Sequence, residues 1–115
     1  VVCDRFYDST TAYQAFADGL DRDMVAQANE LAVNGCRPDL TFVFDVSVEE
    51  AYRRRSGRGA EDRLELKGGA FQEKVAAGFR AIAAEEPARV KLIDAARSVE
   101  EVFADVSAEL RAVGA

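Results

Sequence analysis

The sequence has no histidine and no tryptophan, and it has only two prolines and two cysteines, Cys3 and Cys36. Because histidine is absent, the 115 residues cannot form a Ser-His-Asp triad, a Cys-His catalytic pair or a histidine-containing zinc site on their own. The two cysteines are expected to be small buried hydrophobic residues rather than a disulfide. The chemistry that remains is metal-free or uses oxygen ligands.

Long hydrophobic runs are also missing. No stretch approaches the ~18 consecutive apolar residues of a membrane span, and the start of the chain lacks the basic and apolar regions of a signal peptide. The 15 basic and 21 acidic residues leave a net charge of -6, which argues against a broad surface for nucleic acid or anionic membrane. We therefore expect a soluble cytoplasmic protein without nucleic-acid or membrane partners, although a small basic pocket is allowed.

Three short apolar segments are typical of β-strands: residues 1–3, 40–46 and 89–94. The segment 40–46 is nearly continuous in apolar residues, as in strands that pair in parallel and are covered by helices on both faces. Each of the three segments leads into an aspartate, and these are Asp4, Asp45 and Asp94.

Helix signals fill the segments between the strands. One helix is predicted over residues 10–17 and another over 22–34. Four side chains are predicted to cap helices, the last two in capping boxes with a glutamate three residues on: Ser9, Asp21, Ser47 and Ser98. Two apolar stripes at helical spacing are expected to lie in the core: Phe71, Val75, Phe79 and Ile82, and Val99, Val102, Phe103, Val106, Leu110 and Val113.

This alternation of strands and helices predicts one α/β domain, in which an open parallel sheet has helices on both faces. Ligands of such sheets bind beyond the carboxyl ends of the strands, where the aspartates lie. A segment rich in arginine and glycine, residues 53–69, is predicted to be a mobile lid within the domain. Arg54 and Arg58 are expected to share one helical face and to reach one polyphosphate, while Arg53 and Arg55 point elsewhere.

The residues after the first strand form a specific pattern: Asp4, Arg5, Phe6, Ser9, Ala12, Tyr13 and Gln14. Together with residues 37–41, the lid pattern in 58–65 and residues 93–95, all in the right order, they resemble the thymidylate kinase family over the whole chain. This family transfers a phosphoryl group from ATP to deoxythymidine monophosphate (dTMP). The resemblance implies a three-layer fold of the P-loop kinase type.

The resemblance also implies roles for the first cluster. Arg5 would hold phosphate oxygens, since a planar guanidinium can bridge two of them. Asp4 would lie near Mg²⁺, a hard cation that binds carboxylates and keeps several waters. Thr10 would contact the thymine edge and Tyr13 the deoxyribose. Phe6, Ser9 and Gln14 are supporting substrate-binding candidates.

The lid arginines and the turn after the third strand are assigned to ATP in the same way. Arg54, Arg58 and Arg63 would close on its phosphates and offset charge on the transferred group. Ala96 and Arg97 would lie at the adenine. Structural interpretations stay open for these sites: Asp4 and Arg5 as an ion pair, Tyr13 as core, residues 53–63 as a solvated face, and Ser9 as a cap only.

The sequence departs from the family in one respect, since it has no G-x-x-x-x-G-K-[ST] phosphate-binding loop. Residues 1–115 are therefore interpreted as the C-terminal portion of a thymidylate kinase-like domain, catalytically silent alone and a homodimer when complete. A strand missing between residues 1–3 and 40–46 would leave unpaired edges. Two alternatives stay open: a kinase for another nucleoside monophosphate, and a non-catalytic nucleotide-binding remnant.

Overall fold

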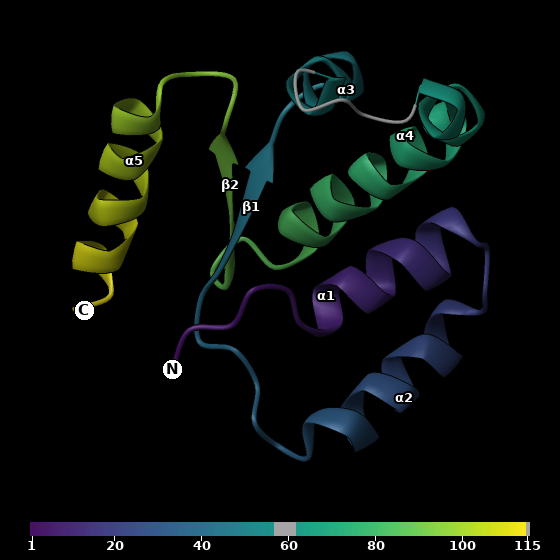
Figure 1. Ribbon diagram of the computed structural model, residues 1–115. Coiled ribbons are helices and arrows are strands. Elements are labelled where there is room, and N and C mark those ends of the chain that lie inside the picture. Colours follow the sequence, from purple (N-terminus) through teal and green to yellow (C-terminus); the bar gives the residue numbers. More distant parts are fainter. Residues whose placement is uncertain (57–61, 115) are drawn as a thin grey trace.

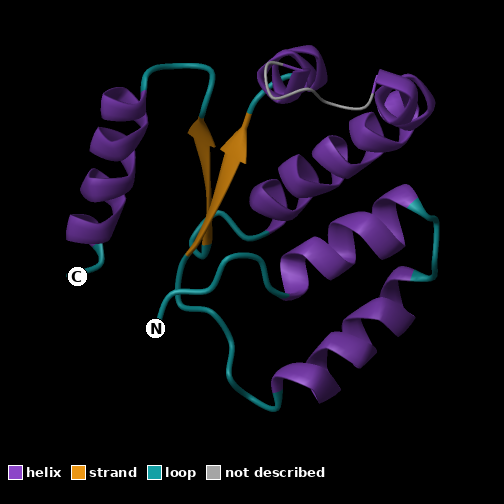
Figure 2. Cartoon of the chain, in the orientation of Figure 1, coloured by secondary structure: helices purple, strands orange, loops and turns teal. Residues whose placement is uncertain are grey.

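The computed structural model describes the backbone of residues 1–56 and 62–114, and the side chains of these residues except 56 and 62–67. Two strands lie between helical layers (Figures 1 and 2). The elements in chain order are α1 (Tyr7–Thr10), the π-helix η1 (Thr11–Ala17), α2 (Arg22–Val33), β1 (Thr41–Asp45), α3 (Val48–Ser56), α4 (Asp62–Glu85), β2 (Val90–Asp94) and α5 (Val99–Ala112).

The strands β1 and β2 pair in parallel, with Thr41 opposite Val90 and Asp45 opposite Asp94. The parallel pairing and the strand predictions for 40–46 and 89–94 are thus confirmed. In Figure 1, α5 lies on one side of the strands, and α4, the α1–η1 segment and α2 lie on the other. This three-layer arrangement agrees with the predicted α/β class, in which helices cover both faces of a parallel sheet.

The core lies between α4, η1 and the strands. Val75 and Ile82 of the first apolar stripe are buried there, and Phe71 and Phe79 pack against them, as predicted. The helices α4 and η1 approach closely at Gly78, where an added Cβ would lie 2.8 Å from Phe16 Cβ. The other members of the buried cluster are Ala12, Ala17, Ala83 and Val90.

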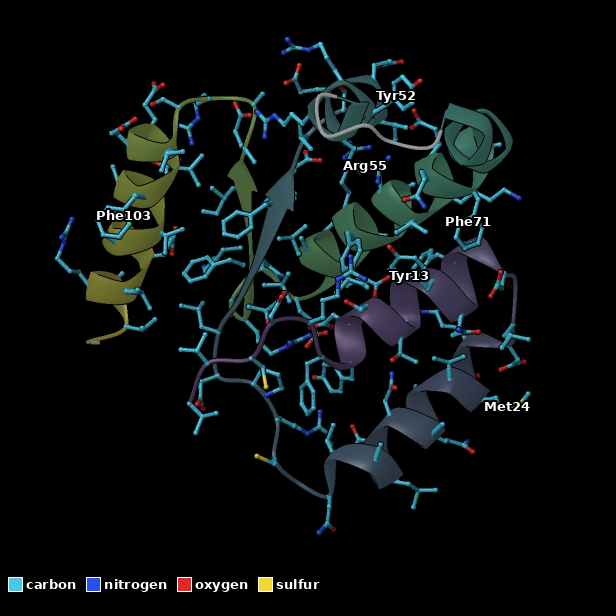
Figure 3. The ribbon with its side chains drawn as sticks, viewed as in Figure 1. Tyr13, Met24, Tyr52, Arg55, Phe71 and Phe103 are labelled. Carbon is cyan, nitrogen blue, oxygen red and sulfur yellow. The ribbon has the colours of Figure 1, made fainter. Side chains whose placement is uncertain are left out.

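The second apolar stripe, on α5, was predicted to be core, and this prediction is wrong. Val99, Phe103 and Val113 are 80%, 69% and 58% exposed, and α5 has no buried residue. Phe103 stands on α5, away from the core aromatic residues (Figure 3). The physical reason is that α5 packs mainly on β2, one narrow strand of a two-stranded sheet, which cannot cover an apolar stripe of this length.

The prediction of a strand at residues 1–3 is also wrong. Val1 and Val2 are fully exposed, and within the described residues β1 pairs with β2 only. A strand needs a hydrogen-bonded neighbour, and residues 1–3 have none in this structure. Cys3 lies on this segment, and Cys36 follows the left-handed turn at Asn34 and Gly35, so both cysteines are exposed rather than buried.

Three of the four predicted caps are present, and one is not. The Asp21 carboxylate accepts from Met24 N–H, the Ser47 hydroxyl accepts from Glu50 N–H, and Ser98 forms a complete capping box with Glu101. Ser9 does not cap a helix, because α1 begins two residues earlier, at Tyr7. Its backbone N–H instead donates to the Phe6 carbonyl, 3.1 Å away.

Candidate functional site

A cleft of about 280 Å³ opens at the carboxyl end of β1, on the side of the sheet that faces α4 and η1. This is the edge that the strand ends predict for a ligand site. Five segments of the chain contribute charged, polar or aromatic side chains to the cleft lining, and these include Arg5, Tyr13, Asp45, Arg55, Gln72 and Phe79.

Arg5 enters the cleft from the loop before α1 and has a left-handed backbone, with φ at 67°. A residue other than glycine seldom adopts this conformation, because its Cβ crowds the following carbonyl. The guanidinium carbon of Arg5 lies 5.8 Å from the centre of the Tyr13 ring, within the range of a cation–π contact. The strained turn thus places a permanent positive charge beside an aromatic wall.

Tyr13 belongs to the π-helix η1, whose wide turn is visible in the hydrogen bond from Asp18 N–H to the Tyr13 carbonyl, 3.0 Å long. The Tyr13 ring packs at a tilt against Phe71 of α4, with 6.0 Å between ring centres. Figure 3 shows the two rings on neighbouring helices. Segments of π-helix are rare and occur frequently at functional sites, where they re-aim side chains. Tyr13 is therefore half-buried against the core and also part of the cleft wall.

The charged residues in the cleft lining are Arg5, Arg55 and Asp45. Asp45, the last residue of β1, accepts from Arg80 Nε at 3.0 Å, and this hydrogen bond raises the pKa of Arg80. Arg80 thus balances the charge of Asp45, while Arg5 and Arg55 bring two guanidinium groups to the cleft lining. Guanidinium groups beside an aromatic ring are suited to an anionic ligand that has a flat ring.

Arg55 was expected to point away, and instead it lines the cleft. It shares one face of α3 with Val48 and Ala51, which line the same cleft at helical spacing. This spacing was present in the sequence and could have identified Arg55. Gln72, one residue after Phe71, was not singled out either, and no sequence signal distinguishes it from other exposed polar residues of α4.

Arg54 lies near the carboxyl end of β2, beside the turn that follows this strand. Its guanidinium donates to the Ala95 carbonyl and to Glu50, both at 2.9 Å. In the same turn, Ala96 N–H donates to Asp94 Oδ1 at 3.0 Å, and Arg97 donates to the Asp94 carbonyl at 3.1 Å. Arg97 also pairs with Asp105 of α5. The structure therefore brings Arg54 to the segment that contains Ala96 and Arg97, through Ala95.

The other predicted site residues lie in the loop before α1 and in α1 and η1. Asp4, Phe6, Thr10 and Gln14 are exposed, and Ser9 is half-buried. Phe6 stacks on Tyr7, with 5.7 Å between ring centres. Within the described residues, none of these five side chains belongs to the cleft lining. Arg58 and the rest of 57–61 lie outside the described residues, as does the side chain of Arg63. The backbone of the remaining parts of the predicted lid, residues 53–56 and 62–69, belongs to the helices α3 and α4.

No group of three or more acidic or cysteine side chains that could hold a metal ion occurs in the part of the chain that the structure describes. Mg²⁺ needs no such cage, because it is commonly held by one or two carboxylates together with waters and substrate phosphates. The single exposed carboxylate of Asp4, beside Arg5, fits that donor set. Among the described helices, none is both long and apolar enough to cross a membrane.

Comparisons with known proteins identify the family of the chain. The family model described as thymidylate kinase matches residues 1–106. The chain is 45% identical to a thymidylate kinase of Exiguobacterium sp. over 100 residues, which are 87% of this chain and 47% of the relative. It is 47% identical to a thymidylate kinase of Chromohalobacter salexigens over 111 residues, which are 96% of this chain and 52% of the relative.

A solved structure gives the same result for the fold. The crystal structure of thymidylate kinase from Ehrlichia chaffeensis matches with a TM-score of 0.71 and 31% identity, over 96% of this chain and 48% of that one. The chain thus spans about half the length of the relatives that it matches. Since the family model covers nearly all of the sequence, the chain belongs to the thymidylate kinase family.

Proposed function

We propose that the complete polypeptide that carries this chain transfers a phosphoryl group from ATP to dTMP, and that the chain forms the C-terminal portion of that enzyme. The family membership supports this proposal, as does the share of the relatives that the chain spans. The single observation that carries it is the position of Arg5, which places a guanidinium in the cleft beside the Tyr13 ring.

The cleft would bind the monophosphate substrate. Arg5 would bridge two phosphate oxygens, and Arg55 would bring a second guanidinium group to the cleft from α3. Tyr13 would pack against the deoxyribose, while Thr10 would contact the thymine edge. Phe6, Ser9 and Gln14 would support this end of the substrate.

The turn after β2 and the lid would bind ATP. Arg54 already lies on this turn through its hydrogen bond to Ala95, and Ala96 and Arg97 would lie at the adenine. Arg58 and Arg63 would join Arg54 on the phosphates, where positive charge stabilises the transition state of phosphoryl transfer. Asp4 would hold Mg²⁺ in part, and the ion would neutralise phosphate charge when bound.

The proposal extends to the setting of the enzyme. The complete protein would be a cytoplasmic homodimer that does not bind nucleic acid. Because these residues contain no phosphate-binding loop, the 115-residue chain alone would not catalyse the reaction. The same observation favours a second candidate, a non-catalytic module that binds a nucleotide. Calorimetric titration of the chain with dTMP and ATP separately, beside an assay for dTDP, distinguishes the two.

The test of the main proposal is a coupled assay of nucleoside diphosphate formation by the complete polypeptide. We expect turnover of dTMP in preference to uridylate, cytidylate and adenylate. Arg5→Ala should lower kcat/KM for dTMP by about 30- to 100-fold, since a charge-assisted contact to phosphate is lost. Arg22→Ala is the matched control, because Arg22 pairs with Glu85 away from the cleft. Equal effects of the two variants would contradict the assignment of Arg5.

A further inference from the structure

Arg89, just before β2, joins segments that are far apart in the sequence. Its guanidinium donates to both carboxylate oxygens of Asp8, each at 2.9 Å, and to Glu86 and Thr41. It also lies over the Tyr7 ring, 5.1 Å from the centre. The Arg89 and Asp8 side chains are only 14% and 9% exposed, so water competes little for this pair. The pair was not predicted from the sequence.

This pair holds the start of α1, because Tyr7 and Asp8 are the first two residues of that helix. Only Phe6 separates Arg5 from the first residue of α1. The position of Phe6 is fixed by the stacking of its ring on Tyr7 and by the hydrogen bond that its carbonyl accepts from Ser9 N–H. Strain like that of the left-handed backbone of Arg5 persists only where the surroundings impose it, and the contacts of Phe6 and Asp8 provide such a constraint on the α1 side.

We propose that the Asp8–Arg89 pair is a positioning device that holds Arg5 in its left-handed conformation and so aims its guanidinium at the phosphate of the monophosphate substrate. This inference rests on the proposed function. A bidentate pair suits the task because two parallel hydrogen bonds fix the rotation of α1 as well as its distance from β2. An apolar contact would fix the distance alone.

Kinetics of the complete polypeptide test the proposal. Asp8→Asn should raise KM for dTMP about tenfold and leave KM for ATP unchanged, because the loss of a charged partner disturbs the aim of Arg5 alone. The same substitution in an Arg5→Ala background should change KM less than about twofold, since the residue that it positions is gone. A purely structural role would lower the active fraction, hence kcat, and would not change KM for one substrate selectively.

Two further variants keep the result interpretable. Glu85→Gln breaks the bidentate pair of Glu85 with Arg22, on the surface away from the cleft, and should leave KM for dTMP unchanged. Arg89→Lys keeps the positive charge but cannot make two parallel bonds, so it should raise KM for dTMP in the same direction and less strongly. If Asp8→Asn fails to fold, the Arg89→Lys variant decides the question.

A ligand-free measurement separates this proposal from the proposed function. The Cα and Cβ chemical shifts of Arg5 report its backbone conformation, and they should move toward ordinary extended values in Asp8→Asn but not in Glu85→Gln. If the wild-type protein does not phosphorylate dTMP, the proposed function fails and these shifts still decide the positioning role. Unchanged Arg5 shifts, or an additive effect of Asp8→Asn and Arg5→Ala on KM, would overturn the proposal.

Discussion

The close approach of α4 and η1 at Gly78 yields a quantitative prediction. A Cβ added there would lie 2.8 Å from Phe16 Cβ and 2.9 Å from Phe16 Cγ, closer than real contacts allow. These atoms lie near the backbone, so Phe16 cannot avoid the clash by rotating its ring alone. The helix η1 would have to move away from α4.

The expected cost combines two opposing effects. Overpacking a well-filled site costs about 1–3 kcal/mol, and two contacts below 3.0 Å place Gly78→Ala toward the upper part of that range. Replacing glycine by alanine within a helix returns about 1 kcal/mol. The net loss is about 1–2 kcal/mol, which corresponds to a Tm lower by about 4–8 °C for a domain of this size.

The matched control is in the same helix. Gly68 has no heavy atom within 4 Å of an added Cβ, so Gly68→Ala should raise stability by about 0.5–1 kcal/mol. Urea unfolding followed by far-UV circular dichroism measures both variants. The two substitutions should have opposite signs, and Gly78→Ala at or above the stability of Gly68→Ala would refute the reasoning. We also expect weaker binding at the cleft in Gly78→Ala, because η1 carries Tyr13.

Three other predictions follow from the described contacts. Ser98→Ala removes the cap of α5 and should cost about 1 kcal/mol in the same urea assay, and no change would contradict the role of the capping box. The hydrogen bond from Arg89 lowers the pKa of Glu86 below its ordinary value of 4.5. The ionised Glu86 therefore stabilises the folded chain at pH values above 4.5, and this stabilisation is lost as the pH falls through the lowered pKa. Glu86→Gln should flatten the acid limb of stability measured by urea titration over about pH 3 to 6, and an unchanged limb would exclude this linkage. Phe103→Ser, at an exposed position of α5, should change the free energy of unfolding by less than about 0.5 kcal/mol. Ile82→Ala, in the core, should lower it by about 2–5 kcal/mol. Comparable losses in the two variants would mean that Phe103 is covered in solution.

Local patterns in the sequence predicted the features that depend on neighbouring residues. The β1 and β2 segments are apolar runs that end in aspartate, and their parallel pairing was expected from the cover on both faces. The cap at Asp21 and the capping box at Ser98 also formed as predicted, because a cap needs only a side chain and a backbone N–H three residues away. The motifs that indicated the family are likewise short patterns of neighbouring residues, so the sequence alone was enough to recognise them.

Features that depend on distant partners were decided by the tertiary structure. The helix α1 begins at Tyr7 rather than after Ser9, and its first turn is held by Arg89, which is 81 residues away from Asp8. The stripe on α5 has the same helical spacing as the stripe on α4, yet none of its residues is buried, because α5 packs mainly on β2. Periodicity specifies which residues share a face, but burial and aim depend on what the rest of the chain places opposite that face.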